Sequence, residues 1–90
     1  MVYLVKYELN RPGQNYPGLW AALGQYDYIR DNGLHSAWFL STSWSAQQVY
    51  NHLAPHIDRS DRIFITRIRP GEHFGWMDQA IWNWITARAS

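Results

Sequence analysis

Cysteine is absent from this chain of 90 residues, so disulfide bonds and zinc sites with thiolate ligands are excluded. Charge is also scarce, since charged residues make up 17% of the chain, below the usual share of about 25%. The formal net charge is only +1. The chain as a whole therefore has no strong electrostatic attraction for nucleic acid.

Long apolar runs are missing as well. None approaches the roughly 20 residues that a membrane-spanning helix needs. The first residues lead directly into a strand pattern, without the basic and apolar regions of a signal peptide. We therefore expect no membrane contact and a location in the cytoplasm.

Large aromatic side chains are abundant. The chain contains six Trp, six Tyr and three Phe, and each such side chain buries about 150–250 Å² when it is packed. This apolar area offsets the thin stability margin of a short chain. We expect one globular domain over residues 1–90.

The first half of the chain predicts a strand, a loop and a helix. In residues 2–9, every second residue is apolar, and the residues between them are partly apolar and partly charged, as in a half-buried strand. Residues 10–15 read as a loop, and a helix is expected to begin near Pro17. Residues 26–30 fit either a continuation of this helix or a second strand, and Ser36 is expected to mark a kink before the next strand.

The second half predicts two more helices and two more strands. Strands are expected over residues 37–42 and 62–69, from their β-branched and aromatic content. Ser45 and Gln48 have the spacing of a capping box at the start of a helix, which Pro55 would bend or end. The C-terminal helix has an apolar stripe at Ile81, Trp84 and Ile85.

This order of elements predicts an α+β fold, the ferredoxin-like βαββαβ sandwich, with a short C-terminal helix. Both central helices are expected on one face of the sheet. The other face is then open, and a homodimer would cover it. The residues expected on the open face are Leu4, Lys6, Glu8, Ile63, Ile65, Arg67 and Arg69.

Several segments resemble the SinR-like family of small proteins. They are residues 3–17 (YLVKYELNRPGQNYP), 36–42 (SAWFLST), 45–48 (SAQQ), 61–65 (DRIFI) and 75–77 (GWM) with the tryptophans that follow. This family looks distantly related to the small CRISPR-associated adaptation subunit. The resemblance implies a ferredoxin-like homodimer connected with nucleic acid and with defence.

Glu8 lies near the end of the first predicted strand. In the nuclease lineage to which the family is related, an Asp stands here and holds a divalent cation across the dimer. The resemblance therefore implies that Glu8 would be the catalytic residue of a metal-dependent endonuclease using Mg²⁺ or Mn²⁺. The extra methylene of Glu displaces the carboxylate, so we expect little or no nuclease activity. The other interpretation is a structural ion pair with Lys6 or with an arginine on the neighbouring strand.

Seven of the eight basic residues are arginine, the side chain that binds phosphate in a bidentate manner. Arg11, Gln14 and Asn15 precede a predicted helix N-terminus and form a candidate anion site. Arg67 and Arg69 alternate along the last strand and are candidates for phosphate contact. The structural alternatives are a turn in the first case and cross-strand ion pairs in the second.

No metal site and no required cofactor are predicted. His52 and His56 stand four residues apart on the second predicted helix, but no third ligand accompanies them. Trp44, Trp76 and Trp82 would stack on bases if they were exposed; buried positions are the alternative.

The sequence thus predicts a small dimeric protein that binds nucleic acid. Two alternatives stay open. One is the endonuclease with Glu8 at the dimer seam. The other is a protein-binding module or inhibitor in a mobile-element or defence context.

Overall fold

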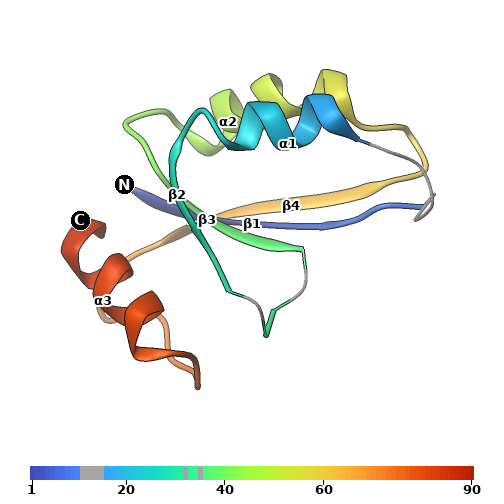
Figure 1. The fold of residues 1–90 in the computed structure, drawn as a ribbon. Helices are drawn as coiled ribbons and strands as arrows, with labels where there is room; N and C mark the ends of the chain where they lie inside the picture. Colours follow the sequence, from blue (N-terminus) through green and yellow to red (C-terminus); the bar gives the residue numbers. More distant parts are fainter. Residues whose placement is uncertain (11–15, 32, 35) are drawn as a thin grey trace.

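The computed structural model describes residues 1–10, 16–31, 33–34 and 36–90. It is an α+β fold, as predicted (Figure 1). The elements follow the chain in this order: β1 (Val2–Glu8), α1 (Pro17–Leu23), β2 (Asp27–Arg30), β3 (Ala37–Ser41), α2 (Ala46–Leu53), a short 3-10 helix η1 (Ala54–His56), β4 (Arg62–Ile68) and α3 (Gln79–Arg88). None of the helices that the structure describes is both long and apolar enough to span a bilayer.

The four strands form one sheet in the order β2-β3-β1-β4, and each neighbouring pair is antiparallel. Val5 in β1 lies opposite Trp38 in β3 and Ile65 in β4. Because directly opposed residues project to the same face of a sheet, this register assigns every strand residue to one of two faces.

Helices α1 and α2 cover the first face (Figure 1). Leu19 and Leu53 from the helices and Val5 and Leu40 from the strands are fully buried there. Helix α2 begins with the predicted capping box. The Ser45 hydroxyl accepts a hydrogen bond from the backbone N–H of Gln48, and the Gln48 side-chain oxygen accepts one from the backbone N–H of Ser45. These contacts make the first face the main core.

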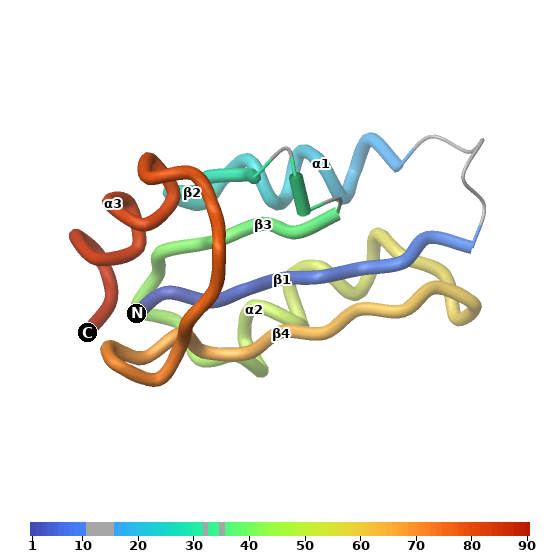
Figure 2. Tube along the Cα trace, turned by 90° about the horizontal axis from the view of Figure 1, so that it is seen from below, coloured from blue at the N-terminus to red at the C-terminus, as the bar shows by residue number. Residues whose placement is uncertain are grey.

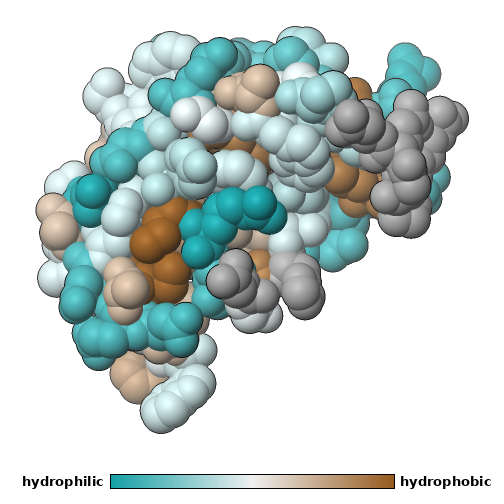
Figure 3. Space-filling model, in the orientation of Figure 1, coloured by the Kyte–Doolittle hydropathy of each residue, from teal (hydrophilic) through white to brown (hydrophobic). Residues whose placement is uncertain are grey.

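Helix α3 packs on the second face (Figure 2). Ile81 and Ile85 are buried against Phe39 of β3. An ion pair of 2.7 Å between Arg88 Nε and Asp27 Oδ2 joins the end of α3 to β2. Figure 3 shows hydrophobic side chains gathered between β2 and α3, with hydrophilic ones around them. The second face is therefore not fully open, because α3 covers part of it.

The expected composition of the second face was wrong for β4. Ile63 and Ile65 lie opposite Tyr7 and Val5 and pack with the main core on the helix side. The side chains that share the second face with Leu4, Lys6 and Glu8 are Arg62, Phe64 and Thr66. A change of one position exchanges all side chains of a strand between the faces, and alternation alone does not say which set faces the helices.

The ambiguous segment after α1 is a strand. Gly24 caps the C-terminus of α1, and β2 then runs from Asp27 to Arg30 along the edge of the sheet. The Arg30 guanidinium lies 4.5 Å from the centre of the Trp38 ring on the helix side. Ser36, where a kink was expected, has a left-handed φ of 61°.

Asp61 connects three segments at one end of the sheet. Its side chain is buried, and it accepts hydrogen bonds from the backbone N–H groups of Asn10 and Asp58, each at 2.8 Å. The Tyr16 hydroxyl also donates to it, at 3.3 Å. One carboxylate therefore holds together the end of β1, the start of α1 and the turn before β4.

Asp61→Ala is expected to lower the free energy of unfolding by about 1–3 kcal/mol, because it removes the buried acceptor of two partly buried backbone N–H groups. Urea denaturation followed by circular dichroism measures the change. Asp58→Ala, at an exposed position three residues away, is the matched control and should alter the stability by less than about 0.5 kcal/mol. Equal effects of the two substitutions would contradict the bridging role of Asp61.

Candidate functional site

The part of the second face that α3 leaves uncovered carries an exposed aromatic ring among charged groups. Phe64 is 64% exposed and lies opposite Lys6 on the neighbouring strand. Arg62 precedes it on the same face and lies opposite Glu8. We call these four residues, Lys6, Glu8, Arg62 and Phe64, the open sheet surface.

The backbone of β1 and β4 holds the open sheet surface in place. Both strands have seven residues and pair along their whole length, from Val2 opposite Ile68 to Glu8 opposite Arg62. The side chains of directly opposed residues start about 4.5–5.5 Å apart. A ring and two cationic groups are thus presented side by side on a rigid sheet. The phenyl ring can stack on a flat apolar ring of a ligand, and the two cationic groups can contact anions beside that ring.

Glu8 takes the structural role that was its alternative interpretation. Its carboxylate accepts from Lys6 Nζ at 2.9 Å, and its side chain is 77% exposed. The described residues contain no group of three or more His, Asp or Glu side chains arranged to hold a metal ion. A metal-binding or catalytic role of Glu8 stays a prediction.

The predicted anion-binding residues are not brought together on the open sheet surface. Arg11, Gln14 and Asn15 lie outside the described residues. Arg67 lies opposite Tyr3, so its side chain leaves β4 on the helix side, and its Nη2 donates to the Ser90 carbonyl at 2.6 Å. Arg69 lies beyond the end of β4 and is exposed. The expectation that Arg67 shares a face with Leu4 was wrong, for the same reason as for Ile63 and Ile65.

The two histidines of the second predicted helix have separate surroundings. His52 Nδ1 and the Tyr26 hydroxyl are 2.6 Å apart, and both rings contact the indole of Trp44. Partial burial raises the pKa of Tyr26. His56 lies in η1 against Gly18, where an added Cβ would come within 2.6 Å of Nδ1. His52 is half-buried, whereas His56 is exposed.

The three tryptophans considered for base stacking differ in exposure. The Trp76 side chain is 99% exposed, whereas Trp44 is 44% exposed and Trp82 is half-buried. Trp76 belongs to the segment between β4 and α3, which crosses the second face over β1 and β3 (Figure 2). Of the three, Trp76 alone is fully available to a ligand.

No family model matches this chain, and no solved structure matches it. The resemblance to the SinR-like family and its relation to the CRISPR-associated subunit therefore stay predictions from the residues.

Phe64 and Arg62 were not among the site residues predicted from the sequence. Alternation divided β4 into two sets of side chains correctly, but the set with Ile63 and Ile65 was assigned to the wrong face. Hydrophobic weight does not separate the two sets, because each contains two large apolar residues and one arginine. The face that each set occupies follows from the register with β1, which local alternation does not reveal.

Glu8→Gln is expected to change the free energy of unfolding by less than about 1 kcal/mol, because an exposed ion pair contributes little. Urea denaturation at two protein concentrations measures this. A larger loss that depends on protein concentration would contradict the exposed pair with Lys6 and would indicate that Glu8 is buried between two copies of the chain.

Proposed function

We propose that this protein is a ferredoxin-like domain that acts in the cytoplasm by binding single-stranded nucleic acid on its open sheet surface, with little or no nuclease activity. The element order and the strand order β2-β3-β1-β4 support the ferredoxin-like arrangement, in which two helices cover one face of an antiparallel sheet. Its setting in defence follows from the resemblance to the SinR-like family.

The exposure of Phe64 is the observation that carries the proposal. An aromatic side chain that is 64% exposed on a flat sheet leaves apolar area in contact with water. Four-stranded sheets of RNA-binding domains present aromatic rings in this way and stack unpaired bases on them. A base stacked on such a ring contributes about 1–3 kcal/mol. Bases inside a duplex have both faces covered by their neighbours, so a single strand is the better ligand.

Lys6 and Arg62 supply cations next to that ring. Lys6 lies opposite Phe64, and Arg62 is two residues away on the same face. Glu8 forms an ion pair with Lys6 and lies opposite Arg62 on the neighbouring strand. Two phosphate contacts on a single strand predict a salt slope, d log K/d log [salt], of about −1.4. The proposed binding therefore depends on stacking more than on charge, in keeping with the net charge of +1.

Phe64→Ala is expected to weaken binding of a fluorescein-labelled 12-nucleotide single strand at least fivefold, because it removes the stacking ring. Fluorescence anisotropy at two salt concentrations, with DNA, RNA and duplex probes, measures this. Tyr50→Ala is the matched control, since Tyr50 is 42% exposed on α2 and lies on the helix side. Equal loss in both variants, or no binding in the wild type, would overturn the proposal.

Arg62→Gln is expected to reduce the magnitude of the salt slope by about 0.7, the contribution of one phosphate contact on a single strand. Arg30→Gln, which removes a cation from the helix side, should leave the slope unchanged. The same titrations with Mn²⁺ test the endonuclease alternative. Cleavage that needs Mn²⁺ and is lost in Glu8→Gln would support that alternative instead.

A second copy of the chain could cover the open sheet surface in place of nucleic acid. The sequence itself predicts a homodimer. Light scattering of the wild type and of Phe64→Ala separates the two occupants. If Phe64→Ala converts a dimer to a monomer and leaves nucleic-acid binding intact, the open sheet surface is the interface between copies. The proposed binding surface would then be wrong.

A further inference from the structure

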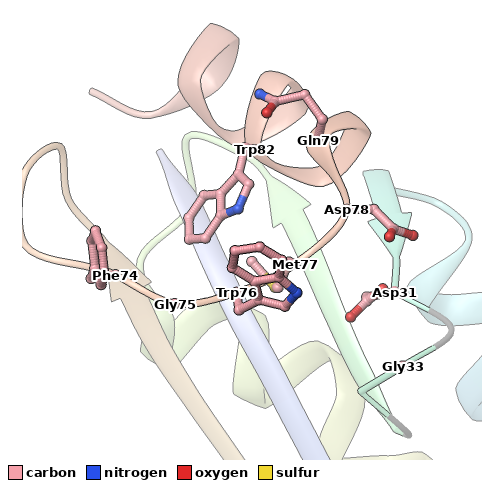
Figure 4. Close-up of a pocket in the computed structure, with 9 residues that line it drawn as sticks. All are labelled: Asp31, Gly33, Phe74, Gly75, Trp76, Met77, Asp78, Gln79 and Trp82. Carbon is pink, nitrogen blue, oxygen red and sulfur yellow. The ribbon is translucent and has the colours of Figure 1, made fainter.

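A pocket of about 700 Å³ lies between the segment that precedes α3 and the turn that follows β2 (Figure 4). The volume is in the range of small-molecule and peptide sites. The side chains that give it its chemistry are Asp31, Phe74, Trp76, Met77, Asp78 and Trp82. They come from segments more than 40 residues apart, so the pocket exists only in the folded chain.

The charge of this pocket is negative. Asp31 and Asp78 are the only charged residues among the nine that line it. Asp78 occupies the N-cap position of α3, but its side chain makes no capping hydrogen bond. Within the described part of the chain, neither carboxylate has a hydrogen-bond or ion-pair partner. Two carboxylates with free acceptor sites in one pocket repel phosphate and attract a cation.

Most of the apolar side chains at this pocket are aromatic, and two of them are exposed to solvent. Phe74 is fully exposed and Trp76 is 99% exposed. The ring of His73 stacks on the Trp82 indole, with an interplanar angle of 15° and a distance of 5.8 Å between the ring centroids. In Figure 4 the carboxylates of Asp31 and Asp78 lie on one side of the Trp76 indole and Phe74 lies on the other. A cation that bound here would have indole faces as well as carboxylates within reach.

We propose that this pocket binds the arginine side chain of a basic segment of a partner protein. A guanidinium is planar, so it stacks on an indole, and it has five N–H donors that match carboxylate oxygens. A quaternary ammonium has no N–H donor and would leave both carboxylates unpaired. The ammonium of lysine donates hydrogen bonds but stacks less well. The volume of the pocket leaves room for the residues next to the arginine.

This site is chemically opposite to the open sheet surface and does not depend on it. The open sheet surface combines one ring with Lys6 and Arg62, whereas the pocket combines rings with two carboxylates. A single strand of nucleic acid is therefore expected on the first and excluded from the second. One chain can thus bind an anionic and a cationic partner on separate parts of its surface.

The test is a titration of the ¹⁵N-labelled 90-residue chain with the peptide acetyl-Gly-Arg-Gly-amide at low salt, followed by NMR. The indole N–H signals of Trp76 and Trp82 should shift together and saturate, with a dissociation constant at or below about 1 mM. The signals of Trp20 and Trp44, on the helix side, should not move. A peptide with citrulline in place of arginine has nearly the same shape without the charge and should show no saturable shift. The lysine peptide should bind severalfold more weakly than the arginine peptide.

Substitution of the carboxylates provides the second test. Asp31→Asn and Asp78→Asn should each weaken binding of the arginine peptide at least fivefold, while Asp58→Asn, which removes the same charge from an exposed turn, should not. Absence of a saturable shift, equal binding of the citrulline peptide, or an equal loss in Asp58→Asn would overturn the proposal. Asp31→Asn should leave single-strand binding unchanged, so this proposal and the proposed function can fail separately.

Discussion

The packing of Ile81 and Ile85 on Phe39 is the contact on which the surface of this molecule depends. A sheet with two helices on one face has a second face that needs cover. Here the C-terminal helix covers the part over β3 and the β2 edge, and the Arg88–Asp27 ion pair joins its last turn to that edge. Ten residues connect the end of β4 to the start of α3, and this segment crosses the sheet before the helix begins (Figure 2). The crossing segment lines the pocket, while the end of β1 and the start of β4 stay uncovered by α3.

The two surfaces that result have opposite character, which the net charge of +1 conceals. The open sheet surface places a phenyl ring beside a lysine and an arginine on a rigid pair of strands. The pocket places two indoles beside two carboxylates. Few charges are needed for this, since each surface uses two or three of them close to an aromatic ring. In this chain, local arrangement is more informative about ligands than overall charge.

Much of the fold could be predicted from the residues. The alternation in residues 2–9, the proline at the start of α1 and the capping box at Ser45 each have a local physical cause, and the structure confirms the elements they predict. The edge strand β2 could not be decided, because it has four residues, three of them exposed, and so carries little periodic signal. The candidate site was predicted less well. Glu8 was placed correctly at the end of β1, but Phe64 was not singled out and Arg67 was assigned to the wrong face.

The sequence by itself determined which segments become strands and helices, because those depend on side-chain periodicity, capping and turn residues close together in the chain. It also determined that cysteine chemistry is excluded. The tertiary structure decided which face of β4 packs against the helices, where α3 lies, and that Asp31 lines the same pocket as Trp76 and Asp78. These outcomes depend on strand register and on contacts between residues dozens of positions apart. Strand register has a period of two, so local alternation is compatible with either face, and only the competition between whole faces for burial selects one.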